Sequence, residues 1–138
     1  MNIDYFAGFF DGEGCIGIYT NGQKHSHNLS VQITQKQSVL TERLLREVLM
    51  TYGGSISTNL KYGKFYHLHY SISGNNAYKL LKDIKSKLKL KKEQAQVAID
   101  WYKARPKVAR NAKGQIMPHD KSVYAADKRV ANRLKELK

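Results

Sequence analysis

The chain has 138 residues, a length typical of one compact domain, and 41% of them are hydrophobic, which excludes a disordered chain. Lys and Arg number 24 against 11 for Asp and Glu, and the formal net charge of +13 points to a polyanionic partner, most often nucleic acid. The single Cys excludes an intrachain disulfide and a zinc finger. No apolar run is long enough for a bilayer and no basic secretory segment opens the chain, so we expect a soluble intracellular protein without a membrane partner. Its host compartment stays open.

The first half of the chain predicts a helix, two strands and a second helix. Residues 3–11 are apolar and end at a Gly-Glu-Gly sequence, which is typical of a short helix. Apolar residues alternate with polar or small ones over residues 15–20 and 29–36, which predicts two strands joined by a turn at 21–24. Ser38 is expected to cap a helix that ends at Gly53-Gly54.

The second half continues with two strands and two helices, so a helix–strand–strand unit is predicted to occur twice. Strands are predicted over residues 55–60 and 65–73, then a helix capped by Asn75 or Asn76, and another from near Leu90 to Lys103. We expect an α+β core over residues 1–103, a basic linker over 104–118 whose arginines and lysines, Arg105 among them, reach phosphates, and a terminal helix over 119–138 capped by Asp120 or Ser122.

The faces of the strands turned away from the apolar core are polar and poor in acids. Such side chains can exchange hydrogen bonds with base edges, so we expect this face to bind DNA, and a plain solvated face is the alternative. The residues predicted to contact DNA are Tyr19, Asn21, Gln23, Ser30, Gln32, Thr34, Ser57, Asn59, Lys61, His67 and His69. His67 and His69 could also pair on a metal, but no third ligand has suitable spacing.

The sequence motif that could support catalysis is the stretch Phe-Ala-Gly-Phe-Phe-Asp-Gly-Glu-Gly at residues 6–14. Its small residues would let two such helices approach closely, and its acids stand at the helix end. Two ends brought together would offer hard oxygen ligands suited to Mg²⁺. The alternative is a core helix that ends in a glycine turn with surface acids.

This stretch resembles the motif of the LAGLIDADG homing endonucleases. It matches at Ala7, Gly8, Asp11 and Gly14, while Glu13 replaces the usual final Asp and keeps the carboxylate. Two further stretches are similar to the family: Gln-Ile-Thr-Gln-Lys at residues 32–36 and Leu-Lys-Leu-Lys-Lys-Glu-Gln-Ala at 88–95. The resemblance covers about residues 3–102.

The resemblance implies an αββαββα fold whose antiparallel sheet forms a saddle on double-stranded DNA. Because only one motif is present, it also implies a homodimer in which the motif helices pair through Ala7, Gly8 and Asp11. Such an enzyme would cleave both strands at a long, near-palindromic site with Mg²⁺, and Mn²⁺ would also support activity.

The resemblance also assigns roles. Glu13 and the Gly12 carbonyl are expected to bind metal, Gln35 to orient the attacking water, and Lys91 to offset charge that develops on the phosphate, with Lys89 as the second choice. Strand parity puts Gln35 on the side of the apolar residues, which fits a pocket, although an exposed strand end is the alternative. Asp11 is expected to cap or pack rather than to bind metal.

Two other functions stay open. A non-cleaving nucleic-acid binder of the same type, an intron RNA maturase or a transcription regulator, would be expected to lose the final acid of the motif, and Glu13 is intact. A generic basic α+β module would not be expected to carry the stretches around Gln35 and Lys91. The sequence therefore favours an endonuclease.

Overall fold

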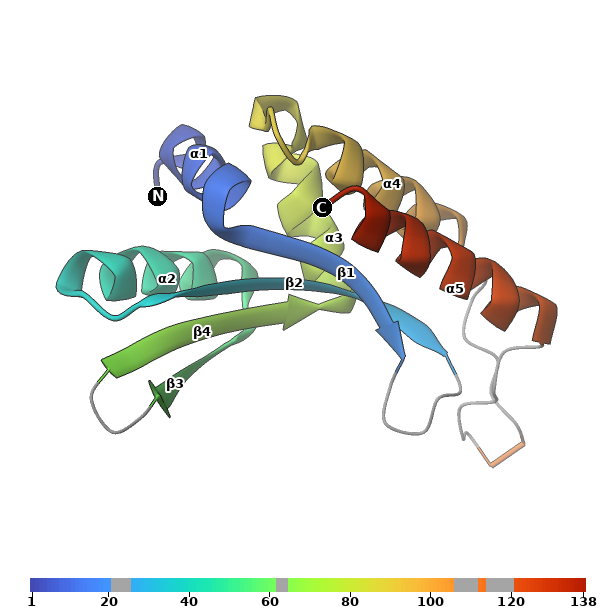
Figure 1. The fold of residues 1–138 in the computed structure, drawn as a ribbon, viewed down its shortest axis with the longest axis horizontal. Coiled ribbons are helices and arrows are strands. Elements are labelled where there is room, and N and C mark those ends of the chain that lie inside the picture. Colours follow the sequence, from blue (N-terminus) through green and yellow to red (C-terminus); the bar gives the residue numbers. More distant parts are fainter. Residues whose placement is uncertain (21–25, 62–64, 106–111, 114–120) are drawn as a thin grey trace.

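The computed structural model describes residues 1–20, 26–61, 65–105, 112–113 and 121–138. These residues form an α+β fold in which the helices cover one face of a four-stranded sheet (Figure 1). The elements in chain order are α1 (Ile3–Glu13), β1 (Gly14–Thr20), β2 (His27–Lys36), α2 (Val39–Tyr52), β3 (Ser55–Lys61), β4 (Phe65–Ser73), α3 (Gly74–Ile84), the short 3-10 helix η1 (Lys85–Lys87), α4 (Lys92–Ala104) and α5 (Lys121–Glu136). The predicted αββαββα order is confirmed. Over the described residues, no helix combines the length and the apolar character needed to cross a membrane.

The sheet is built from two hairpins that meet in its middle. Its strand order is β1-β2-β4-β3, and every neighbouring pair is antiparallel. The hairpin β1–β2 follows α1 and the hairpin β3–β4 follows α2, so the helix–strand–strand unit is used twice, as the sequence predicts. Because β2 and β4 join along Ser30–Lys36, the two units form one continuous sheet.

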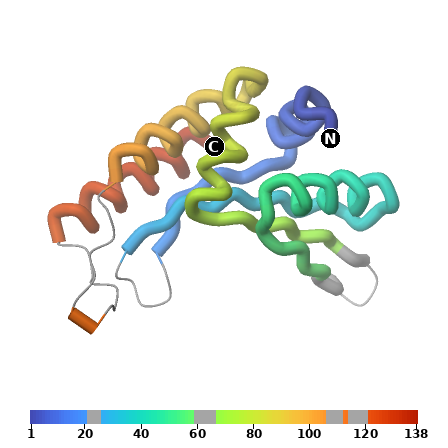
Figure 2. The backbone as a smooth tube through the Cα atoms, turned by 180° about the vertical axis from the view of Figure 1, so that it is seen from behind, coloured from blue at the N-terminus to red at the C-terminus, as the bar shows by residue number. Residues whose placement is uncertain are grey.

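The alternation predicted for the strands decides which face is buried. On β2, His27, Leu29, Val31 and Ile33 are buried beneath the helices, while the residues between them point to the opposite side. We call that opposite side, which the helices leave uncovered in both views, the outer face (Figures 1 and 2).

Several predicted helix ends are confirmed and one is corrected. The Ser38 hydroxyl accepts the Thr41 N–H at 3.0 Å, and α2 ends at Gly53, whose φ of 88° favours glycine. The Asn75 or Asn76 cap is wrong, because α3 already begins at Gly74. The helix predicted from near Leu90 to Lys103 is confirmed as α4, which begins at Lys92 and ends at Ala104.

The terminal helix α5 packs on the same body rather than standing apart. It lies beside α4 and β1, with Ala131 and Leu134 in the core (Figure 2). The indole N–H of Trp101 on α4 donates to the buried Asp127 carboxylate at 2.8 Å. The expectation that Arg105 reaches phosphates is corrected, because its guanidinium donates to the His27 carbonyl at 3.0 Å and stacks on Trp101.

Candidate functional site

The two sides of α1 have different tasks. Phe6, Ala7, Phe10 and Asp11 face the core of their own chain, and Ala7 is fully buried there. The opposite side exposes Gly8 and Gly12, which are one helical turn apart. A Cβ added at either glycine would meet no atom within 4 Å. The expectation that Ala7 and Asp11 present their side chains to a partner helix is therefore corrected, because the rotation of α1 turns both inward. Gly8 stays on the free side.

Asp11 holds together two segments that are far apart in the chain. Its carboxylate accepts the backbone N–H groups of Lys89, Leu90 and Lys91 at 3.0, 2.9 and 2.8 Å. Burial is the largest single influence and raises the pKa of Asp11, but the three N–H donors and the charge of Lys91 outweigh it, so this pKa lies below its ordinary value. Asp11 is thus an ionised anchor whose oxygens are already occupied within the chain.

This anchor places Lys91 at the end of the motif helix. The Lys91 ammonium donates to the backbone carbonyl of Asp11 at 2.6 Å, one residue before Gly12. The Lys89 side chain, in contrast, is exposed, and only its N–H contacts Asp11. Of these two lysines, only Lys91 has its ammonium bound at the C-terminal end of α1.

The strand register brings Gln35 toward the same place. Gly14 at the start of β1 pairs with Ile33 on β2. Gln35 lies two residues further along β2 and is therefore on the side of the junction where α1 leads into β1. Gln35 is half-buried on the helix-covered side, as its parity predicts, and its side-chain oxygen accepts the Lys36 N–H at 3.1 Å. We call this group, formed by Gly12, Glu13, Gln35 and Lys91, the motif corner.

The donors at the motif corner fit a hard divalent cation. Glu13 and Gly12 are exposed at the C-terminal end of α1, where backbone carbonyls give the helix its negative pole. Carboxylate and carbonyl oxygens are the ligands that Mg²⁺ prefers. Over the described residues of one chain, no group of three or more His, Cys, Asp or Glu gathers around a common point.

The outer face carries the polar residues expected to meet DNA, and the strand register arranges them in rows. Thr34 opposes His69, and Ser57 opposes His69 from the other side. The Thr34 hydroxyl and the His69 Nδ1 share a hydrogen bond of 2.7 Å. None of the four strands that the structure describes contains an Asp or Glu, which suits a surface that approaches phosphates.

The other predicted DNA contacts are placed to different degrees. Tyr19 lies on the outer side of β1 with its ring over Gly17, while Ser30, Gln32 and His67 project from the outer sides of β2 and β4. Asn21 and Gln23 lie outside the described residues. Asn59 and Lys61 are placed only through the backbone pairing of β3, and their side chains are likewise outside what the structure describes.

The sequence reasoning missed the contribution of the last residues. Lys138 places its ammonium 3.0 Å from the Cys15 sulfur, and the Gln94 amide donates to the Leu137 carbonyl at 3.1 Å. A cavity of about 380 Å³ lies there, next to the motif corner, lined in part by Lys91. No local pattern in the sequence could have brought residues so distant in the chain together.

Comparisons with known proteins agree with this geometry. The family model described as LAGLIDADG endonuclease matches residues 6–105. The fold is similar to the homing endonuclease I-CvuI in complex with its target, with a TM-score of 0.73 at 22% identity over 99% of this chain and 81% of that one. It is also similar to the archaeal intron-encoded homing endonuclease I-Vdi141I complexed with DNA (TM-score 0.67, 16% identity, 99% and 83% of the two chains). For I-GzeII in complex with its DNA target, the TM-score is 0.66 at 17% identity, and the match covers 95% of this chain but 43% of that one. No curated protein sequence matches the chain significantly.

Proposed function

Because the chain belongs to the LAGLIDADG endonuclease family, we propose that it is a homodimeric, metal-dependent homing endonuclease that cleaves both strands of double-stranded DNA at a long, near-palindromic site. The observation that carries the proposal is the pair of bonds that hold Lys91 on Asp11, whose carbonyl accepts the Lys91 ammonium two residues before Glu13. This arrangement puts one acid and one cation at the exposed end of α1, where a phosphate can reach both.

Two observations support a homodimer. The match to I-GzeII covers 95% of this chain but 43% of that DNA-bound chain, which is therefore more than twice as long as the matched part. Two copies of the present chain would supply a comparable total length. The free side of α1 carries Gly8 and Gly12 with open space beyond them, which lets a second α1 approach closely. A two-fold axis through this side would bring two Glu13 carboxylates together and would repeat the outer face on both halves of a near-palindrome.

The residues of the motif corner then divide the work. Glu13 and the Gly12 carbonyl would hold Mg²⁺, or Mn²⁺, which supplies Lewis-acid polarisation of the phosphate and a lowered pKa for bound water. Lys91 offsets the negative charge that grows on the phosphate oxygens during cleavage. Gln35 orients the attacking water through its amide, whose oxygen is fixed by the Lys36 N–H.

Exchanging Glu13 for Gln tests the proposal. Glu13→Gln keeps the shape and removes the charge, so cleavage should fall by several orders of magnitude while DNA binding survives or tightens. Glu42→Gln is the matched control, since Glu42 forms only a surface ion pair with Arg46 on α2. Ca²⁺ in place of Mg²⁺ should likewise permit binding with little cutting.

The measurement is gel shift and nicking on one target selected from a DNA library by cleavage with Mg²⁺. Cleavage by Glu13→Gln at the wild-type rate would overturn the assignment of the metal ligand. A wild-type chain that binds DNA but never cuts any member of the library would identify a non-cleaving binder, such as a maturase or a regulator.

A further inference from the structure

We propose that α5 carries a second DNA-contacting surface, a lysine flank formed by Lys121, Lys128 and Lys135, which binds phosphates beside the edge strand β1. The inference rests on the proposed function and deepens it, because it assigns part of the DNA contact to a helix beyond the matched family region, which ends at residue 105.

The spacing of the three lysines puts them on one side of α5. They follow one another every seven residues, and seven residues make almost two whole turns of an α-helix. The side of α5 that contains Asp127, Ala131 and Leu134 is buried, and the three lysines are exposed along one margin of it. The flank is therefore a continuous line of positive charge along the helix.

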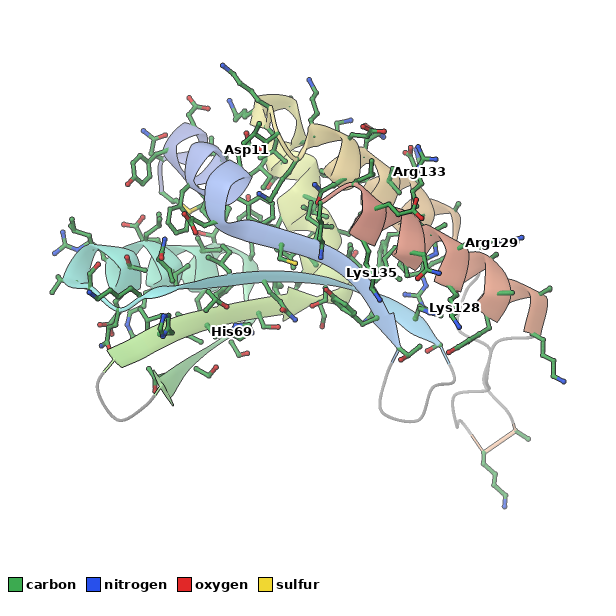
Figure 3. The ribbon with its side chains drawn as sticks, viewed as in Figure 1. Asp11, His69, Lys128, Arg129, Arg133 and Lys135 are labelled. Atoms are coloured by element: carbon green, nitrogen blue, oxygen red, sulfur yellow. The ribbon has the colours of Figure 1, made fainter. Side chains whose placement is uncertain are left out.

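The flank points toward the sheet rather than away from it. In Figure 3, Lys128 and Lys135 extend from the side of α5 that faces β1, whereas Arg129 and Arg133 extend from the opposite side. Arg133 lies 3.7 Å from Glu93 at the start of α4, which agrees with that direction. The helix thus carries two basic sides, and only one of them borders the sheet.

Contacts at the end of α5 connect this side to the outer face. Lys138 reaches the side chains of Cys15 and Tyr19 on β1, and both belong to the outer face because Gly14, Ile16 and Ile18 alternate with them toward the core. A duplex lying on the outer face would therefore meet the lysine flank where it passes over the β1 edge.

The chemistry of the flank fits phosphates rather than bases. Lys128 and Lys135 make no hydrogen bond or ion pair with any residue in the described part of the chain, so their ammonium groups are available to a ligand. A lysine is a point charge on a flexible stem, which suits a phosphate oxygen and carries little sequence information. We therefore assign the flank to affinity and to the orientation of the duplex, while the outer face reads the sequence.

The two sides of α5 supply a matched pair of variants. Lys128→Gln with Lys135→Gln removes two of the three lysines of the flank, and Arg129→Gln with Arg133→Gln removes the same charge from the other side. In a dimer each double variant loses four positive charges in total, and thermal melting followed by circular dichroism checks that both fold. Binding of duplex DNA is measured by fluorescence anisotropy between about 50 and 200 mM salt.

The lysine variant should bind duplex DNA at least about tenfold more weakly. The slope of log K against log salt should become shallower by roughly 3 to 4 units, because each of the four lost phosphate contacts contributes about 0.9 unit. The arginine variant should stay within about threefold of wild type with an unchanged slope. Equal losses in both variants, or wild-type binding by the lysine variant, would overturn the inference. A wild-type chain that binds no duplex DNA even at low salt would instead overturn the proposed function.

Discussion

The motif corner and the outer face are built on different physical principles. At the motif corner, one buried carboxylate accepts three backbone N–H groups and its own carbonyl accepts the Lys91 ammonium. On the outer face, over the described residues, one hydrogen bond between side chains of neighbouring strands joins Thr34 and His69. The corner is therefore fixed by partly buried, charge-assisted hydrogen bonds, while the outer face is a row of exposed and half-buried side chains on a sheet.

This difference separates the two tasks of the proposed enzyme. Catalytic groups must be held in one geometry, so they stand on a helix end that buried hydrogen bonds lock in place. Base-reading groups must be exchangeable without loss of the fold, so they stand on strands whose buried side alone stabilises the sheet. Changes at the corner should therefore alter the rate or the stability, and changes on the outer face should alter which DNA is bound.

After Glu13→Gln, the largest effect is expected from Lys91→Met. Removing the ammonium should lower the cleavage rate by about 10²- to 10³-fold, the usual cost of losing one group that stabilises developing charge, while DNA binding changes by a few-fold at most. Lys89→Met is the matched control, because the Lys89 side chain is exposed and only its N–H contacts Asp11. Single-turnover cleavage is the measurement. A larger loss in Lys89→Met would move the catalytic role to that lysine.

Asp11→Asn should weaken the fold more than any exposed substitution. The amide leaves at least one of three partly buried N–H donors without an acceptor, so the free energy of unfolding should fall by about 1 to 3 kcal/mol. Urea unfolding measures the loss. Asp100→Asn is the control, since Asp100 is exposed and only accepts a local bond from Gln96, and it should change stability by less than about 0.5 kcal/mol. Equal losses in both variants would contradict the anchoring role.

The same variant gives a pH dependence with a defined sign. The pKa of Asp11 in the folded chain lies below its ordinary value of 3.8, so its stabilisation is fully present above that pH and is lost as the pH falls toward the folded value. The stability difference between wild type and Asp11→Asn should therefore be constant near neutral pH and should shrink below about pH 4. A difference that grows on acidification would show that the carboxylate is not held ionised.

Gly8→Leu should weaken self-association by at least tenfold, because the side chain would hold two α1 helices apart; packed helix axes lie only about 8 to 10 Å from each other. The glycine has open space around it in one chain, so the fold itself should tolerate leucine. Lys79→Leu adds leucine at an exposed position of α3 and is the control. Sedimentation at micromolar concentration is the measurement. A wild-type chain that stays monomeric with and without DNA would exclude the homodimer.

Local patterns predicted the order of the elements, because strand alternation, the Ser38 cap and the glycine ends are short-range signals. Glu13, Gln35 and Lys91 were singled out by the resemblance to the family, and their roles stay predictions. The rotation of α1 was not predictable, since Ala7 and Gly8 are both small and only the packed core decides which one is buried. The Asp11 anchor joins residues 78 to 80 apart in sequence, and no periodicity reports such a contact.

The smallest effect is expected from Thr34→Val on the outer face. Valine keeps the shape and the strand propensity but removes the hydroxyl that bonds His69 at 2.7 Å. Because this bond is exposed, the free energy of unfolding should change by less than about 0.5 kcal/mol. Discrimination at one base pair of the target should change by about fivefold, near the lower end of what one base contact supplies.

The measurement is a competition among all single-base variants of the selected target, with the cleavage rate on the preferred target measured beside it. Thr51→Val is the matched control, because Thr51 is exposed on α2 and donates only to a carbonyl of its own helix. It should leave both the base preferences and the rate unchanged. If Thr34→Val instead slowed cleavage equally on every target, the outer face would act on the rate as the motif corner does. The proposed division, in which the motif corner catalyses cleavage and the outer face selects the DNA sequence, would then be wrong. These side chains would affect the cleavage rate rather than the choice of target.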